Sequence, residues 1–196
     1  MRMILASSLF LAFGLTGAGP ALAQQADAPP AMVLTIPGFA DGSEIPVEFT
    51  QAAENAEPGG GTSPEISWQN VPEGTEGFVL HFHDVDVVRE NTTEDQLHWL
   101  VWNIPASATG LAEGLPSGTL EDGSHQSSAT GPVYRGPGAP ASGPLHHYMF
   151  ELYAIDTTLD IEPVEDAFEN RRQVMEAIQG HVLGKAAYVG LFKRPE

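Results

Sequence analysis

The sequence predicts a predominantly β fold in one domain, with helix confined to the region near the C-terminus. Short apolar or alternating segments follow one another along the chain, and Pro, Gly, Asn and Asp residues separate them. Only one stretch, near the C-terminus, shows helical periodicity. The 173 residues from Gln24 onward are enough for one domain with a substantial core.

Residues 1–23 have the layout of a secretory signal peptide. Arg2 precedes an apolar run over Met3–Leu15, and Ala21-Leu22-Ala23 provides a cleavage site of small residues. The run is shorter than the roughly 20 residues that cross a membrane as a helix. We therefore expect cleavage after Ala23 and a periplasmic or secreted protein without an integral membrane segment. A retained membrane anchor is the alternative.

The mature chain is expected to consist of a short N-terminal segment and one folded domain. Residues 24–31 are rich in Ala, Gln and Pro and are expected to be disordered, and the domain is expected to span residues 32–196. The sequence contains no Cys. Disulfides and thiol catalysis are therefore excluded, and stability must come from packing.

The chain is strongly acidic. Lys and Arg number 8 against 26 Asp and Glu, a formal charge of −18 that becomes −19 when Arg2 leaves with the signal peptide. Such a field repels nucleic acids and anionic lipid surfaces. We expect no nucleic-acid partner, and an anionic ligand would depend on local donors, whereas a zwitterion is less penalised. Acidity that serves only solubility is the simpler interpretation.

Seven segments have the pattern of short strands. Each is apolar or alternates apolar and polar residues, and turn-forming residues bound it. The segments are Met32–Ile36, Ile45–Thr50, Ile66–Trp68, Phe78–Asp84, Trp99–Ile104, Tyr148–Ile155 and Ala187–Phe192.

A helix is predicted over about residues 170–179. Asn170 and Gln173 form a capping-box pattern, apolar residues then recur at helical spacing, and Gly180 ends the segment. A second short helix is expected over His181–Lys185, and Pro163–Phe168 is expected to add a further turn.

Two long segments show neither pattern. Ala52–Thr62 contains three consecutive glycines and is typical of an insertion in a hairpin. Leu111–Pro144 is dense in Gly, Pro and Ser and is longer than a passive connection in a compact domain, so it is expected either to carry function or to be disordered.

The first group of chemically active residues lies at the end of a predicted strand. Alternation places His81 and His83 on one face, and Asp84 follows at the strand end. A polar ligand pocket and a merely solvated His81 are two interpretations. Two strand histidines also begin several β-barrel metal sites, so a zinc or iron site completed by His98 or His146 is a third.

The next predicted strand begins beside His98. Trp99 and Trp102 are expected on its opposite faces, where they serve as core and sheet cover. His98 by itself is a weak signal of function.

A third group occupies the Gly- and Pro-rich segment Gly136–Tyr148. It contains Gly-x-Gly-x-x-Ala, but Pro137 and Pro140 lack amide donors and no helix follows, which argues against a dinucleotide site. The glycines instead allow backbone amides to approach a small anion beside His146. A rigid lid without a ligand is the alternative.

Motifs of common catalytic sites are absent from the sequence. It has no Gly-x-Ser-x-Gly elbow, no phosphate-binding Walker loop and no His-Glu-x-x-His. We therefore assign no catalytic residue, expect no cofactor and favour a protein that is not an enzyme.

The order and spacing of several motifs carry a family resemblance. They are Phe39, Gly42, Ile45-Pro46, Thr50, Ser63-Pro64-Glu65-Ile66-Ser67-Trp68, Val71-Pro72-Glu73-Gly74-Thr75, Phe78, His98, Asn103-Ile104-Pro105, Gly136-Pro137, Leu145-His146-x-Tyr148, Leu152-Tyr153-Ala154-Ile155-Asp156 and Gly180-His181-Val182-Leu183. Over residues 33–194 the chain resembles the phosphatidylethanolamine-binding protein family, most closely its bacterial branch of Raf-kinase-inhibitor-like proteins.

The resemblance implies a large antiparallel sheet packed on a smaller one, a few C-terminal helices, and a small anion pocket at one end of the sheet. Val85 and Val88 stand where the family's Asp-Pro-Asp-x-Pro motif has its prolines, and His147 stands where an Arg commonly follows the His. By position, the pocket residues are Asp84, Asp86, His98, the Gly136 and Gly138 backbone, His146 and Tyr148.

These residues suggest how a ligand is held. An imidazole beside a carboxylate gains proton affinity, so His98 or His146 near Asp84 is expected to be cationic and to hold a phosphate or carboxylate. An acid at the rim would meet an ammonium group, which favours a phosphoethanolamine-like zwitterion.

The first hypothesis is an exported, non-catalytic binding protein with a pocket for a phospho-headgroup and a capacity to regulate a partner protein. One alternative is a metal-dependent enzyme that uses His81, His83 and His98 or His146. Another is an inhibitor or scaffold of a second exported protein.

Overall fold

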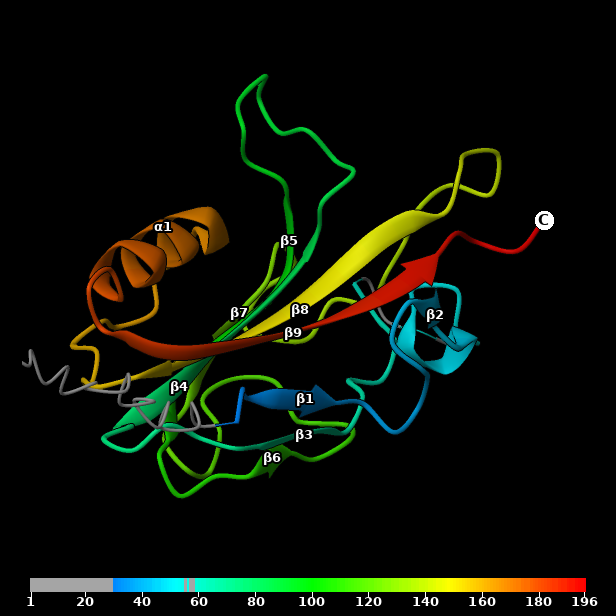
Figure 1. Cartoon of the computed structure of the whole chain (residues 1–196). Helices are drawn as coiled ribbons and strands as arrows, with labels where there is room; N and C mark the ends of the chain where they lie inside the picture. Colours follow the sequence, from blue (N-terminus) through cyan, green and yellow to red (C-terminus); the bar gives the residue numbers. More distant parts are fainter. Residues whose placement is uncertain (1–29, 55, 57–58) are drawn as a thin grey trace, which may run out of the picture.

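The computed structural model describes residues 30–54, 56 and 59–196. Within them, a three-stranded sheet, a six-stranded sheet and one α-helix form successive layers (Figure 1). The predicted mainly β fold with a large and a smaller sheet is confirmed. The predicted signal peptide and residues 24–29 lie outside the described residues.

The large sheet has the strand order β2-β9-β8-β4-β5-β7. Its interior strands are long and its two edge strands are short, which limits the exposed backbone at the edges. Neighbouring strands are antiparallel except for the parallel pair β2 and β9. The bounds are β2 Ser43–Glu44, β4 Gly77–Asp84, β5 Gln96–Pro105, β7 His125–Ser127, β8 His146–Ile155 and β9 Val182–Phe192.

The small sheet packs on one face of the large sheet and encloses the main core. It consists of β1 (Val33–Thr35), β3 (Ile66–Gln69) and β6 (Gly110–Leu111), all antiparallel. Phe82 of β4 and Phe150 of β8 are fully buried between the sheets, and their rings stack with centroids 3.8 Å apart.

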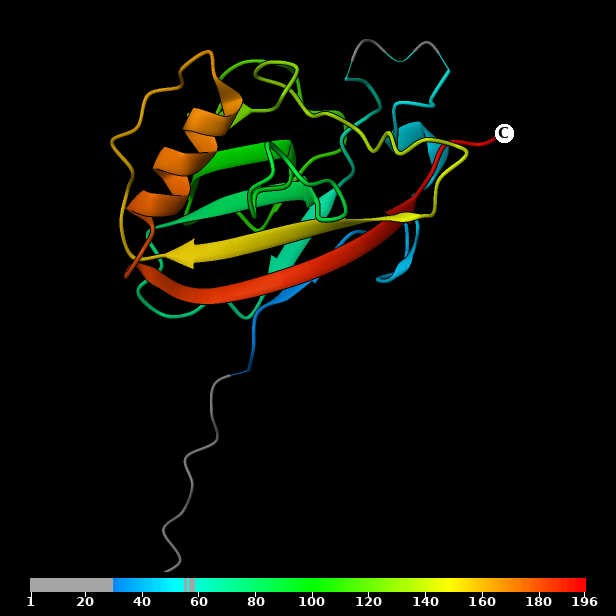
Figure 2. The same ribbon diagram turned by 90° about the horizontal axis from the view of Figure 1, so that it is seen from above.

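Helix α1 (Ala167–Ala177) covers the opposite face of the large sheet (Figure 2). Its Val174 packs there in a second core with Val79 and the indole of Trp102, whereas Trp99 faces the main core. The two Trp residues therefore lie on opposite faces, as predicted. Because both faces are covered, all eight residues of β4 are buried. No helix in the described part of the chain combines the length and apolarity needed to cross a membrane.

The predicted helices differ from the observed one at both ends. Helix α1 begins earlier, because the Asp166 carboxylate accepts hydrogen bonds from the amides of Phe168 and Glu169 and caps it. Asn170 is instead fully buried and binds the backbone of Val164. The predicted helix over His181–Lys185 is wrong, because β9 begins at Val182 and pairs with β8.

The predicted strand over Ile45–Thr50 is also wrong. Pro46 starts a 3-10 turn, η1 (Val47–Phe49), and the Thr50 hydroxyl donates to the Val47 carbonyl to close it. The turn places Phe49 in the core. The sequence missed β2, β6 and β7, because strands of two or three residues are too short to show a period.

Candidate functional site

A hollow of about 280 Å³ opens at one end of the large sheet. The end of β4 lies there beside the starts of β5 and β8, because these neighbours are antiparallel. Five predicted site residues line the hollow, namely Asp84, His98, Gly138, His146 and Tyr148. Its other walls come from Gln51, Val87, Gln96, Arg135, Ala139, Pro140 and Arg194.

Asp84 and His146 form an ion pair or strong hydrogen bond within the hollow. The Oδ2 atom of Asp84 lies 2.7 Å from Nδ1 of His146, and its Oδ1 accepts the amide of Asp86 at 3.0 Å. Asp84 is 2% exposed. The buried carboxylate therefore orients the imidazole at the wall of the hollow.

The Gly/Pro segment is held by contacts within the protein. The Tyr148 hydroxyl accepts the amides of Gly138 and Ala139 at 3.2 and 3.0 Å. The Gly136 amide donates to the carbonyls of Gly59 and Gly60 at 2.9 and 3.0 Å. The amides of the two predicted glycines are thus already used, and they are not free donors for an anion.

Gly136 lies where two loops approach each other closely, and it does not line the hollow. A Cβ at this position would lie 2.4 Å from the Gly60 carbonyl oxygen and 2.7 Å from that of Phe49. Only glycine fits such an approach to backbone atoms. The Gln51 side chain also donates to the Gly136 carbonyl at 2.8 Å. Together with the bonds from the Gly136 amide to Gly59 and Gly60, this contact fixes the position of Gly136.

His98 is buried and neutral. Its Nδ1 lies 2.9 Å from the Arg135 carbonyl oxygen, which can only accept, so Nδ1 carries the proton. Burial lowers the pKa of His98 to about 4. The expectation of a cationic imidazole is therefore wrong for His98, and its Nε2 is an acceptor for a ligand N–H or O–H.

Two arginines supply the positive charge of the hollow. Nε of Arg135 is buried without a hydrogen-bond partner among the described residues, while Arg194 donates to Oε1 of Gln51 at 3.0 Å. Burial lowers the pKa of Arg135, but a guanidinium stays protonated at neutral pH. Sequence reasoning missed both residues, although basic residues are scarce and Arg135 directly precedes Gly136.

The sequence matches the model of a known protein family. The family model described as phosphatidylethanolamine-binding protein matches residues 35–193. The chain belongs to this family.

Relatives of the family from several microorganisms align with most of the chain. A UPF0098 protein of Methanothermobacter thermautotrophicus is 40% identical over 166 residues, which cover 83% of this chain and 99% of the relative. The crystal structure of the Chlamydia trachomatis homologue CT736 has a TM-score of 0.68 at 28% identity and covers 84% of this chain and 99% of its own. Escherichia coli YbcL, described as a member of the mammalian PEBP family, has a TM-score of 0.71 at 24% identity over 85% and 100% of the two chains.

This family member closes the corner after β4 with hydrogen bonds in place of prolines. The Val85 amide donates to the His147 carbonyl at 3.2 Å, a bond that proline cannot make. Asp86 accepts the His147 amide at 2.6 Å and lies 2.9 Å from its Nδ1. Partial burial raises the pKa of Asp86, but these bonds outweigh it and lower the pKa. Asp86 thus shapes the corner outside the hollow.

His81 and His83 lie on the opposite face of the sheet from the family's pocket. His81 pairs across the strands with Glu151, whereas the ring of His98 contacts Phe82 on the core face. The predicted metal site that combined His81 and His83 with His98 or His146 is therefore wrong. A solvated His81 is also wrong, because it is only 6% exposed.

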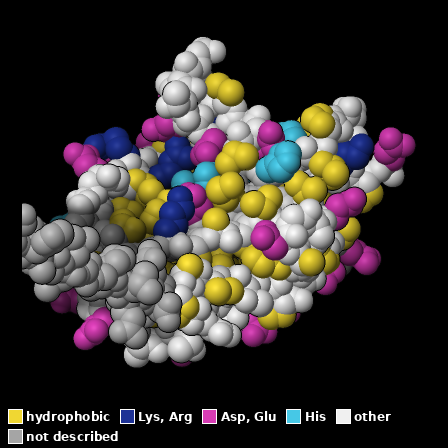
Figure 3. Space-filling model, viewed as in Figure 1, with side chains coloured by type: hydrophobic (Ala, Val, Ile, Leu, Met, Phe, Trp, Pro, Cys, Tyr) yellow, Lys and Arg dark blue, Asp and Glu magenta, His cyan; other side chains and the backbone are white. Residues whose placement is uncertain are grey.

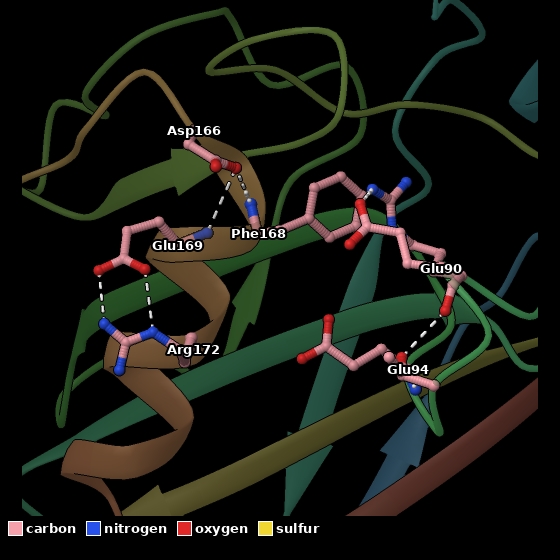
Figure 4. A pocket seen from close by; sticks show the side chains of 8 residues that line it. Glu90, Glu94, Asp166, Phe168, Glu169 and Arg172 are labelled. Atoms are coloured by element: carbon pink, nitrogen blue, oxygen red, sulfur yellow. Dashed lines mark hydrogen bonds and ion pairs between the residues drawn. The ribbon is translucent and has the colours of Figure 1, made fainter.

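A further hollow of about 360 Å³ lies between the β4–β5 connection and the start of α1 (Figure 4). Its charges pair with one another. Arg172 binds Glu169 at 2.6 Å, Asp166 caps the helix, and the guanidinium of Arg89 lies 3.5 Å from the ring centroid of Phe168. Among the described residues that line this hollow, every charged side chain has a partner, whereas Nε of Arg135 in the hollow at the sheet end has none.

Proposed function

We propose that this protein is an exported, non-catalytic binding protein that holds a phosphoethanolamine-like headgroup in the hollow at the sheet end. The family is described by its binding of phosphatidylethanolamine, whose headgroup carries a phosphate and an ammonium. The proposal extends that chemistry to the residues of this chain.

The observation that carries the proposal is the presence of both charge signs in one small hollow. Arg135 and Arg194 offer guanidinium donors, which suit phosphate oxygens. Asp84 offers a carboxylate, and Nε2 of neutral His98 offers a lone pair, and both of these groups suit an ammonium. Inorganic phosphate contacts only the arginine donors, whereas a zwitterion contacts the arginine donors with its phosphate and the two acceptors with its ammonium.

The strong negative charge of the chain supports the same ligand class. A field from 26 acidic residues against 8 basic ones disfavours a multiply charged anion at a distance. A zwitterion has little net charge, so this field affects it less before it meets Arg135 and Arg194 in the hollow. The selectivity then comes from local contacts.

Export completes the proposal. The layout of residues 1–23 supports cleavage after Ala23 and a periplasmic or secreted location, where regulation of an exported partner protein would take place. Mass spectrometry of the protein recovered from the host's extracytoplasmic fraction tests this. An N-terminus that retains Met1 would contradict export with cleavage.

Calorimetric titration of the untagged chain from Gln24 in phosphate-free buffer tests the ligand. We expect phosphoethanolamine to bind more tightly than either inorganic phosphate or ethanolamine. Arg135→Met should weaken phosphoethanolamine about 10- to 100-fold, because it removes a charged hydrogen bond worth roughly 1.5–3 kcal/mol. Arg172→Met, which removes an exposed arginine on α1, is the matched control.

Two outcomes would overturn the ligand assignment. Equal affinity for phosphate and phosphoethanolamine would remove the role of Asp84 and His98. Unchanged affinity in Arg135→Met would show that the ligand binds elsewhere.

A further inference from the structure

Two buried histidines on the helix-covered face of the large sheet lack the hydrogen bonds that buried imidazoles normally make. His81 and His83 are 6% and 7% exposed, and their rings stack with centroids 4.1 Å apart. Both ring nitrogens of His81 and Nε2 of His83 have no partner among the described residues. A neutral imidazole has one donor and one acceptor, so His81 leaves both unsatisfied.

A buried polar atom without a hydrogen-bond partner lowers the stability of the folded protein by about 1–3 kcal/mol, unless a ligand or ion binds it. The surroundings of the two histidines are not apolar. His83 lies beside Asp95 and Glu151, and Figure 3 shows one face of the molecule on which imidazole, acidic and basic side chains are neighbours. Ligand atoms of His81, His83 and Asp95 lie within 4.8 Å of one another.

Asp95 orients His83 and is not available as a ligand. Its Oδ2 lies 2.5 Å from Nδ1 of His83, and its Oδ1 accepts from Nη1 of Arg171 at 2.8 Å. A carboxylate that binds one ring nitrogen fixes the tautomer and leaves the other nitrogen free to bind a metal. Nε2 of His83 is therefore the donor atom.

Glu151 supplies the carboxylate that completes the site. Its Oε1 pairs with Lys185, and its Oε2 accepts the Tyr153 hydroxyl at 2.8 Å and keeps a second lone pair for a metal. Its Oε2 lies 3.4 Å from Nε2 of His83 and 3.7 Å from Nδ1 of His81. Ligands at about 2.0–2.1 Å from a tetrahedral Zn²⁺ are separated by about 3.3–3.4 Å. The two distances from Glu151 Oε2 are thus close to the separation between ligands of a tetrahedral zinc site.

The charges around the three ligands favour a cation. Glu94, Asp95 and Glu151 carry three negative charges, against the positive charges of Arg171 and Lys185 that pair with them. A dipositive ion therefore enters a cluster with an excess negative charge. Two imidazoles and one carboxylate select a transition metal over Mg²⁺ or Ca²⁺.

One movement is required. In the stacked arrangement the lone pairs of the two rings lie in nearly parallel planes, because the ring planes differ by only 11° and the centroids are 4.1 Å apart. One ring must rotate so that both lone pairs meet at one point. His81 makes no hydrogen bond, so its rotation breaks none.

An entry path leads to the histidines from outside. A hollow of about 430 Å³ opens between α1 and the sheet, and its walls include His81, Glu94, Asp95, Arg171 and Glu176. An ion can therefore approach the ring of His81, whose nitrogens are buried in the stacked arrangement, from this hollow.

We propose that His81, His83 and Glu151 bind one divalent transition-metal ion of the Zn²⁺ class, with Asp95 as the positioning residue for His83. The site lies on the opposite face of the sheet from the headgroup hollow. A result against the metal site would therefore leave the proposed function unaffected, and the reverse also holds.

The test uses the untagged chain after treatment with a chelator. Calorimetric titration with Zn²⁺ should give one ion per chain, and Mg²⁺ should give none. His81→Phe and His83→Gln should each weaken Zn²⁺ binding at least 100-fold. Asp95→Asn should weaken it about 10- to 100-fold, because it removes the carboxylate that orients the ring of His83. His181→Gln, which removes an exposed imidazole paired with Asp156, is the matched control and should bind as the parent chain does.

Near-UV circular dichroism checks that each variant keeps its tertiary packing. If a variant fails to fold, the visible spectrum of Co²⁺ bound to the parent chain still decides. Intense bands indicate a four-coordinate site with nitrogen ligands, and pale octahedral bands overturn the proposal. Failure to bind Zn²⁺ stoichiometrically, or equal binding by His81→Phe, His83→Gln and the control, also overturns it.

Discussion

The buried, neutral state of His98 predicts a pH dependence of folding that one substitution removes. His98→Asn keeps an amide donor near the position of Nδ1, which binds the Arg135 carbonyl, but it cannot titrate. Burial lowers the pKa of His98 from 6.5 to about 4. The unfolded chain therefore binds a proton between these values while the folded chain does not, and stability falls as the pH is lowered through this window.

The size of the effect follows from the two pKa values. A residue that is 2% exposed needs no allowance for solvent screening. The difference between 6.5 and about 4 corresponds to about 3 kcal/mol in total, of which about 2 kcal/mol is lost between pH 7 and pH 5. This loss should be present in the parent chain and absent in His98→Asn.

Urea unfolding in phosphate-free buffers at pH 7, 6 and 5 measures the difference. Both proteins share every other titrating group. The difference between their free energies of unfolding therefore changes with pH only because of His98. Parallel curves for the two proteins would refute the buried neutral imidazole. A gap that widens towards acidic pH, with His98→Asn less stable than the parent, would also refute it.

Three further predictions concern packing, capping and the wall of the hollow. Phe150→Ala should lower the free energy of unfolding by about 3–5 kcal/mol, because it empties a fully buried ring position stacked on Phe82; a loss below about 1 kcal/mol in urea unfolding would contradict this packing. Asp166→Ala should cost about 1 kcal/mol through loss of the N-cap of α1, whereas the exposed Asp160→Ala should cost little, and equal losses would count against the cap. Tyr148→Phe should cost about 1–3 kcal/mol, because it leaves the amides of Gly138 and Ala139 without their acceptor. Hydrogen exchange of those two amides should then accelerate, and unchanged exchange would show that another acceptor serves them.

Much of the fold follows from local patterns in the sequence. Phe78–Asp84 and Tyr148–Ile155 are long apolar or alternating runs, and each coincides with most of an interior strand. The predicted opposite placement of Trp99 and Trp102 follows from the strand period and is confirmed. The period does not reveal two-residue strands such as β2, whose only reason to be extended is its pairing with β9.

Helix boundaries were less predictable because competing local signals exist. Asp166 and Asn170 are both residues that favour a cap. The burial of Asn170 against Val164 and Ser127 decides between them, and that burial depends on contacts with β7 that are distant in the sequence. In the same way, Val182–Lys185 is extended because β8 provides a partner.

The candidate pocket was predictable in its position and less so in its chemistry. The family resemblance predicted seven pocket residues. Five of them line one hollow, namely Asp84, His98, Gly138, His146 and Tyr148, whereas Asp86 and Gly136 lie outside it. The charge of His98 depends on burial and on the Arg135 carbonyl, which sequence spacing does not reveal. The role of Arg194 depends on the C-terminal segment passing the 51 and 139 positions.

The sequence by itself determined the family, the mainly β architecture, the absence of thiol chemistry and the two faces of β4. The family depends on the order and spacing of motifs, and the other properties depend on composition and on periodicities that adjacent residues set. Only the tertiary structure decided which side chains meet. It separated His81 and His83 from His98, paired them with Asp95 and Glu151 from other strands and segments, and added two arginines to the hollow. The physical reason is that alternation defines which face a residue occupies, while strand pairing and burial define its neighbours, its protonation and therefore its chemistry.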